Sequence, residues 1–188
     1  MRTLRPLGIK TLVTAVALLL MPASVFCQED FGFMPKGGKT LLLELTAKPA
    51  ELREIGAARH SEAEWREFVA ARKTAAMTER DVNELAAYLA INMPVANDVP
   101  AKAQDSAALA EAFPPDGREL AWEHCQFCHS FFSGYLMQSR DVQGWRSVFL
   151  SPFHRNIKMT EQERETFARY STISMPMKAE NVPADLRF

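Results

Sequence analysis

Residues 77–94 read MTERDVNELAAYLAINMP, and residues 159–176 read MTEQERETFARYSTISMP. Eight of the eighteen aligned positions are identical, whereas average composition gives about one identity by chance. Upstream of each stretch lies a Trp-Arg pair, at Trp65 and at Trp145, with two extra residues in the second copy. Self-similarity of this kind indicates two related units in one chain.

Local signals predict that both copies are helices. In each copy a threonine stands three residues before a carboxylate, Thr78 before Asp81 and Thr160 before Glu163. The second pair is a full capping box. Apolar residues at helical spacing follow in the first copy, at Val82, Leu85, Ala86 and Leu89. The chain is therefore predicted to be all-α.

A second motif lies between the two copies. Residues 125–129 read Cys-Gln-Phe-Cys-His, the C-x-x-C-H pattern of covalent haem attachment. Two thiols three residues apart on a helical turn reach the two vinyl groups of one porphyrin, and the adjacent His129 is placed to ligate the iron as the proximal ligand. We therefore expect thioethers at Cys125 and Cys128 and one covalent haem c.

Two other interpretations of a C-x-x-C pair are weaker here. A redox dithiol expects a strand before the cysteines, but residues 116–124 predict a helix that begins with a glycine. Half of a zinc site needs a second pair of ligands at similar spacing, and the sequence has none. A disulfide between the two cysteines stays an alternative that the following histidine argues against.

With these residues the chain resembles the class I cytochrome c family. The resemblance covers about residues 115–177 and rests mainly on the five-residue motif, a helix at 117–124, and a helix at about 160–173 that contains Tyr170. Residues 144–146 with the final helix are also similar to the haem domains of quinohaemoprotein amine dehydrogenases. The resemblance implies a fold in which the first and last helices cross over one edge of the haem, and electron transfer as the function.

The first half lacks the haem motif. Cys125 stands twenty residues before Trp145, and Leu45 stands twenty residues before Trp65, with no cysteine or histidine beside it. We therefore interpret the first half as a cytochrome c-like repeat without haem. The alternative is an ordinary helical segment whose likeness to the second half is a coincidence.

These observations predict tandem cytochrome c-like helical domains, the first degenerate. Residues 28–93 form the haem-less repeat in this prediction. Residues 94–115, rich in proline and alanine, form a linker with a short helix at 106–112. Residues 116–188 form the cytochrome c domain.

Residues 1–27 read as a secretory signal peptide, because a basic start is followed by an uncharged apolar stretch at 11–21. Cleavage is expected after Cys27 or after Ser24, and a retained N-terminal anchor is the alternative. A lipid-modified Cys27 is disfavoured, because the bulky Phe26 precedes it. The protein is thus predicted to be periplasmic or otherwise exported, with no spanning helix if the signal is cleaved.

The sixth ligand of the iron is the least determined residue. The candidates are His124, Met137, His154, Met159, Met175 and Met177. His124 adjoins the proximal cysteine and is excluded. In the resembled family the ligand precedes the last helix by about half a dozen residues, and His154 stands six residues before Thr160. Because Met159 has Met77 as its counterpart in the haem-less copy, we prefer His154 and keep Met159 as the alternative.

The predicted function is single-electron transfer outside the cytoplasm, as a carrier or as the electron-transfer subunit of an oxidoreductase, with unidentified redox partner proteins. The formal net charge of −1 gives no reason to expect nucleic acid. The sequence contains no recognisable substrate site, so catalysis by this chain alone is not expected. The alternatives are a haem-based sensor or small haem enzyme with an open distal site, and a structural subunit.

Overall fold

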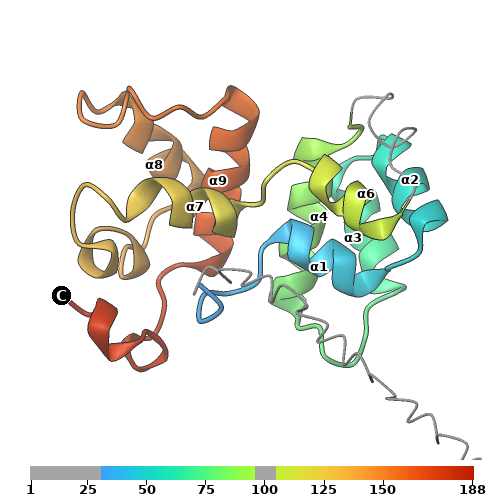
Figure 1. Cartoon of the computed structure of the whole chain (residues 1–188), viewed down its shortest axis with the longest axis horizontal. Helices are drawn as coiled ribbons and strands as arrows, with labels where there is room; N and C mark the ends of the chain where they lie inside the picture. The colour runs from blue at the N-terminus through green and yellow to red at the C-terminus, as the bar shows by residue number, and fades with distance from the viewer. Residues whose placement is uncertain (1–30, 96–104) are drawn as a thin grey trace, which may run out of the picture.

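The computed structural model describes residues 31–95 and 105–188 (Figure 1). Within these residues all regular structure is helical, so the predicted all-α class is confirmed for this part of the chain. The predicted signal peptide lies outside the described residues.

The described residues of the first half form five helices. They are α1 (Gly38–Leu45), α2 (Pro49–Ala57), α3 (Glu62–Ala70), α4 (Glu79–Asn92) and α6 (Ser106–Ala112). Helix α4 packs against α1 and α3, and α2 packs against α6. Every described turn of α4 buries side chains, with Val82, Leu85 and Leu89 fully enclosed. This half lies on the right in Figure 1.

The second half is built around its last long helix. Its elements are α7 (Gly117–Cys125), a π-helical turn η1 (Phe132–Leu136), α8 (Val142–Ser147), a 3-10 turn η2 (Val148–Leu150), α9 (Glu161–Ser174), and two 3-10 turns η3 (Ala179–Asn181) and η4 (Ala184–Leu186). Both α7 and α8 pack against α9. The two copies of the repeat are therefore α4 and α9, which occupy the same central position in their halves.

The helix starts follow the predicted capping signals. Thr78 and Asp81 exchange side-chain and backbone hydrogen bonds at the start of α4, as Thr160 and Glu163 do at the start of α9. Both pairs are thus capping boxes, although only the second has the glutamate of the common pattern. The same exchange between Ser61 and its N3 glutamate begins α3.

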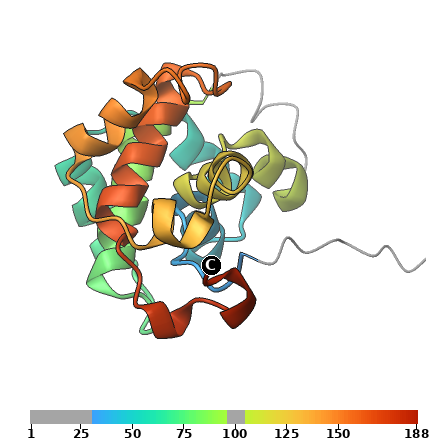
Figure 2. The same ribbon diagram turned by 90° about the vertical axis from the view of Figure 1, so that its left-hand side faces the viewer.

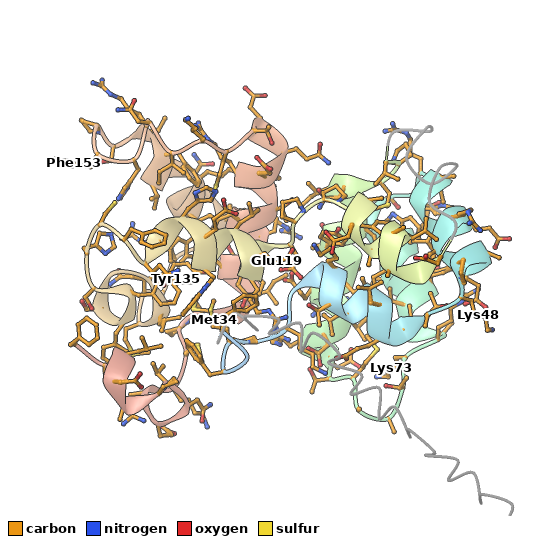
Figure 3. All side chains as sticks on the ribbon, in the orientation of Figure 1. Met34, Lys48, Lys73, Glu119, Tyr135 and Phe153 are labelled. Carbon is orange, nitrogen blue, oxygen red and sulfur yellow. The ribbon has the colours of Figure 1, made fainter. Side chains whose placement is uncertain are left out.

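The hydrophobic cores extend beyond the two predicted domains. Leu109 and Phe113, from the segment predicted as a linker, are buried in the core of the first half. Met34, from the segment that precedes α1, is only 2% exposed and belongs to the core of the second half. Figure 3 shows Met34 beneath the helix that carries Glu119. The core of the first half therefore includes residues of the predicted linker, and the core of the second half includes a residue of the predicted first domain.

The first helix of each half, α1 or α7, begins with a glycine that lies against a tyrosine of α4 or α9. A Cβ atom added to Gly38 would lie 2.1 Å from the Cβ of Tyr88, and one added to Gly117 would lie 2.1 Å from the Cβ of Tyr170. Only glycine allows the backbones to approach this closely. The crossing of α1 with α4 therefore repeats the crossing of α7 with α9.

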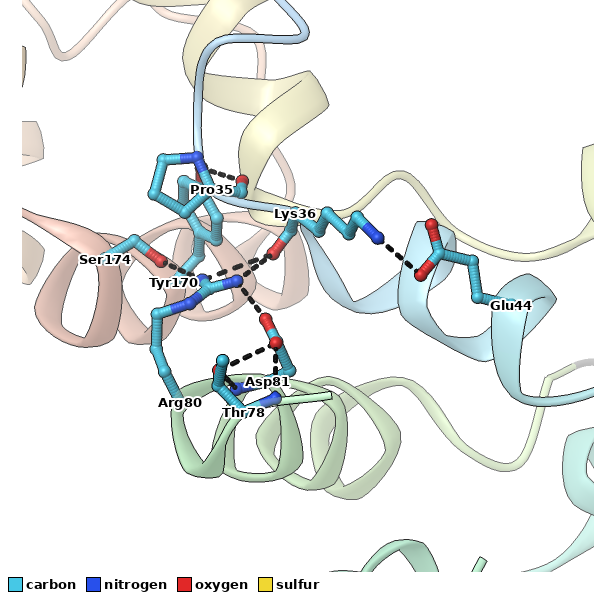
Figure 4. A network of polar contacts seen from close by, with 8 residues as sticks. All are labelled: Pro35, Lys36, Glu44, Thr78, Arg80, Asp81, Tyr170 and Ser174. Atoms are coloured by element: carbon cyan, nitrogen blue, oxygen red, sulfur yellow. Dashed lines mark hydrogen bonds and ion pairs between the residues drawn. The ribbon is translucent and has the colours of Figure 1, made fainter. Parts of the chain in front are cut away.

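The two tyrosines also connect the halves reciprocally. The Tyr88 hydroxyl donates to the Pro114 carbonyl at 2.7 Å, just before α7. The Tyr170 hydroxyl donates to the Pro35 carbonyl at 2.7 Å, just before α1 (Figure 4). Each buried tyrosine hydroxyl thus donates its hydrogen bond to a backbone carbonyl in the segment that leads into the opposite half.

Helices α4 and α9 form the main interface between the halves. In Figure 2, where the second half faces the viewer, α9 lies in front of α4. Arg80 at the start of α4 donates to the Ser174 hydroxyl at 3.0 Å (Figure 4). Gln162 at the start of α9 donates to the side-chain oxygen of Asn92 at 3.1 Å. Arg80 and Gln162 occupy corresponding positions of the two copies, and so do Asn92 and Ser174. Each contact is therefore the counterpart of the other, and the halves meet with an approximate twofold relation.

Candidate haem-binding site

A cavity of about 180 Å³ in the second half is lined by the end of α7, η1, α8 and the loop before α9. Its walls include three of the predicted haem residues, Cys125, Cys128 and His129, and both candidates for the distal ligand, His154 and Met159. Ligand pockets usually span about 300–1,000 Å³, so a cavity of this size encloses only part of a porphyrin. The remainder would extend toward the surface, where Cys128 and His129 are exposed.

The cysteines lie at the end of the helix that packs on α9. Cys125 is the last residue of α7, and Leu45 is the last residue of the corresponding α1. The thiols of Cys125 and Cys128 are free, without a disulfide. Burial raises the pKa of the Cys125 thiol to about 12, so the sulfur is held in its neutral form.

The His129 ring is oriented by the backbone beside it. Its Nδ1 atom lies 3.1 Å from the Ser130 carbonyl oxygen. A carbonyl only accepts, so Nδ1 is the protonated nitrogen of the neutral ring and Nε2 keeps the lone pair that binds a metal. Gly134 allows this position, since an added Cβ would lie 2.2 Å from Nδ1 of His129.

His154 is held in a matching way on the other side of the cavity. Its Nδ1 atom lies 3.2 Å from the Val148 carbonyl oxygen, which leaves Nε2 available. The ring centroids of His129 and His154 are 6.1 Å apart. When two imidazoles bind one metal, each metal–nitrogen bond is about 2 Å long, and the distance from each nitrogen to the centre of its ring is added to it. The two ring centroids are then roughly 6 Å apart. The spacing therefore suits a metal between the two rings.

Methionine sulfur is also present at this cavity. Met159 lines it and is 7% exposed. Met175 is buried in the same core but does not line the cavity, and neither do Met137 and Met177. The counterparts Met77 and Met93 are buried in the core of the first half. Packing thus accounts for all the repeated methionines, and only Met159 has a second possible role.

Aromatic rings form the inner wall of the cavity. Tyr135, which Figure 3 labels, contacts the rings of Trp145 and Phe167 at centroid distances of 5.3 and 5.6 Å. Its hydroxyl lies 2.9 Å from the Ser171 hydroxyl, and burial raises the pKa of Tyr135 well above its ordinary value. An apolar wall of this kind suits the face of a macrocycle. Tyr135 was not singled out from the sequence.

The cavity wall also contains two hydrogen-bond donors: one has no partner among the described residues, and the other, Arg140, makes only a long bond of 3.4 Å to the side-chain oxygen of Gln138. The indole nitrogen of Trp145 is buried and bonds to no atom of the described residues. The guanidinium of Arg140 lies 5.6 Å from the Trp145 ring centroid, and both residues line the cavity. An indole and a guanidinium can only donate, so this edge suits an acceptor such as the carboxylates of haem. The residues present therefore fit a haem.

Apolar side chains are exposed around the same site. The large hydrophobic residues most exposed in the described chain are Phe127, Leu150, Phe153 and Phe188. Phe127 stands between the two cysteines, while Leu150 and Phe153 adjoin the cavity residues Phe149 and His154. Large apolar side chains are normally buried, so these residues form an exposed apolar surface next to the motif and the cavity.

Other kinds of site find no support in residues 31–95 and 105–188. No group of three or more His, Cys, Asp or Glu side chains there is arranged to hold a metal ion. No helix in the same ranges has the length and apolar character needed to cross a bilayer. Comparisons with protein-family models, with curated proteins and with solved structures gave no match, so the role of the site rests on its geometry.

Proposed function

We propose that the chain is a mono-haem c-type cytochrome that transfers single electrons outside the cytoplasm. The single observation that carries the proposal is the pairing of the C-x-x-C-H motif at 125–129 with His154, whose ring centroid lies 6.1 Å from that of His129 with the ring planes inclined at 66°. A bound haem supplies a centre that accepts and releases one electron. The chain supplies attachment, ligation and an apolar enclosure.

The residues divide these tasks between them. Cys125 and Cys128 hold the haem through thioethers, so that it is retained outside the cell. His129 and His154 would ligate the iron, and each ring is oriented by its Nδ1 contact with a backbone carbonyl. Trp145 and Arg140 would donate hydrogen bonds to the carboxylates of the haem. Two imidazole ligands lower the reduction potential relative to a histidine–methionine pair.

An electron carrier is favoured over a haem sensor by the same geometry. A sensor or small haem enzyme needs an open or easily displaced sixth position. Here His154 is half-buried beside the cavity, and its ring is fixed by the Val148 carbonyl. We propose that the protein passes electrons to and from redox partner proteins, and that the haem-less half is a scaffold or docking unit.

Binding of carbon monoxide to the reduced protein tests the function. We expect no change in the Soret spectrum on adding carbon monoxide at neutral pH, since both axial positions are filled. We also expect an optical redox titration to follow a one-electron curve with one midpoint. Rapid binding of carbon monoxide by the wild-type protein would contradict the carrier and favour a sensor or haem enzyme.

A further inference from the structure

The first half contains a cavity of about 410 Å³ at the place that corresponds to the haem pocket. The end of α1 lines it as the end of α7 lines the haem pocket, and Trp65 lines it as Trp145 lines the other. Its volume lies within the usual range for small-molecule sites, about 300–1,000 Å³. The first half thus has a pocket but none of the residues that attach or ligate a haem through C-x-x-C-H.

The tryptophan is repeated in the two pockets, and in each pocket a side chain from five residues earlier contacts its ring. Five residues before Trp145 stands Arg140, and five residues before Trp65 stands His60. The His60 ring lies 4.8 Å from the Trp65 ring, edge to face. Like that of Trp145, the indole nitrogen of Trp65 is buried without a hydrogen-bond partner. A buried donor without an acceptor is costly, so this position favours a ligand that supplies one.

A second donor lies in the same wall. The guanidinium of Arg72 sits over the Phe68 ring at 3.9 Å from its centroid, and it donates only a long bond of 3.4 Å to the Phe68 carbonyl. The remaining N–H groups of Arg72 make no hydrogen bond within the described residues. A guanidinium fixed on an aromatic ring is well suited to a carboxylate.

The acidic residues of the wall do not reverse this preference. Glu51 accepts bonds from the Thr46 hydroxyl and the Lys48 ammonium, both at 2.7 Å. The bonds from Lys48 and Thr46, with a smaller contribution from the positive charge of Arg72, lower the pKa of Glu51, so its charge is compensated within the chain. Glu54 lies at the exposed rim. The remaining walls are apolar, from Leu45, Ile55, Ala58 and Phe68.

We propose that this pocket binds a small organic carboxylate with an apolar or aromatic body. The carboxylate accepts from Trp65 and Arg72, and the body packs against Ile55 and Phe68. The ligand can be a free acid or the C-terminal carboxylate of a peptide, which share this chemistry. The site is separate from the haem pocket and does not depend on the haem.

Isothermal titration calorimetry on the purified full-length protein tests the proposal. Phenylacetate represents the free acid, N-acetyl-Ala-Phe represents the peptide terminus, and phenethylamine is the cationic control. We expect at least one of the two carboxylates to bind and the amine not to bind. The tighter of the two identifies the source, and equal or tighter binding of the amine overturns the proposal, as does the absence of binding by both acids.

Variants then locate the site. Trp65→Phe keeps an aromatic side chain but removes the indole N–H donor. Arg72→Gln removes the positive charge of the guanidinium. Each should weaken binding of the carboxylate about tenfold or more. Arg66→Gln, an equal loss of charge on an exposed residue of α3, should leave it unchanged. Binding that shifts the Soret band, or that survives both Trp65→Phe and Arg72→Gln, would place the acid elsewhere and overturn the assignment.

Discussion

At the scale of single residues, the residues that would attach the haem or ligate its iron differ in how far the sequence determines them. Cys125, Cys128 and His129 follow from a five-residue motif, because their chemistry depends on local spacing alone. His154 was preferred over Met159 from its distance to the last helix and from the comparison of the two copies. The structure places both residues at the cavity, and it adds the contact of His154 with the Val148 carbonyl, which no local pattern reveals.

Substitution of the two candidates separates them. We expect wild-type ferric protein to lack the weak sulfur-to-iron band near the red end of the visible spectrum, since both ligands are imidazoles. His154→Ala should become high-spin and bind carbon monoxide readily when reduced. Met159→Leu should leave the iron spectrum unchanged and cost less than about 1.5 kcal/mol of stability, because it conserves side-chain volume.

The opposite pattern would identify the other ligand. If a sulfur band is present in the wild-type protein and Met159→Leu removes it, Met159 ligates the iron. In that case His154→Ala would keep the low-spin spectrum. Optical spectra of the three proteins at one pH are sufficient for the comparison.

At the scale of elements, the helices were largely predictable and their packing partners were not. The capping and periodicity signals predict a helix at about 160–173, and the corresponding α9 spans Glu161–Ser174. The short helix at 106–112 was also predicted correctly as α6. Its role in the core of the first half was not predicted, because the contacts of Leu109 and Phe113 join segments far apart in the sequence. Periodicity identifies a buried face but not the element that covers it.

The glycine contacts between the first and last helices provide a test of this packing. Gly38→Ala and Gly117→Ala each place a methyl group about 2 Å from a tyrosine Cβ. Since this overlap forces the helices apart, we expect each variant to lose about 1–3 kcal/mol or more of stability in urea unfolding. Gly32→Ala should change it little, because an added Cβ there meets no atom within 4 Å.

Comparison of Gly38→Ala with Gly117→Ala also tests whether the two halves pack in the same way. If α1 and α4 cross as α7 and α9 do, the losses for Gly38→Ala and Gly117→Ala should be of similar size. A loss at Gly117 with none at Gly38 would show that the crossing of α1 and α4 is not required in the same way. Similar small changes for all three alanine variants would contradict the close packing itself.

At the scale of the whole molecule, the two halves meet over buried carboxyl groups. Glu84 of α4 is fully buried, and burial raises its pKa to about 8. The groups that face it are Asp116, which also raises the pKa, and Arg80, Arg169 and the backbone N–H of Gly38, which lower it. Burial likewise raises the pKa of Asp116, whose carboxylate accepts from the N–H of Thr40 in the opposite half.

These shifts predict how stability depends on pH. The folded protein keeps the Glu84 proton up to about pH 8, whereas the unfolded chain releases it near 4.5. The folded state therefore binds more protons between these values, and the free energy of unfolding should fall as pH rises through this window. Glu84→Gln should remove much of the slope and stabilise the protein at pH 8 by roughly 2–5 kcal/mol. The pKa of Asp116 is also raised by burial, so this group contributes to the slope in the same direction.

Urea unfolding at pH 5, 6.5 and 8 measures this effect. Glu67→Gln, which neutralises an exposed carboxylate on α3, is the matched control and should keep the wild-type slope. A Glu84→Gln variant with the wild-type slope would show that Glu84 does not hold a proton in the folded protein. The burial of Glu84 was not predictable, because the sequence does not show that α9 of the other half packs against α4.

The covalent haem is the central claim, and it is tested most directly on the denatured protein. Thioethers survive unfolding, so haem attached at Cys125 and Cys128 must stay with the polypeptide. We expect a haem-stained band on a denaturing gel at the mass of the mature chain, and a pyridine haemochrome with one haem c per chain. A polypeptide with the haem-free mass, or haem that is released into solution on unfolding, would contradict the claim.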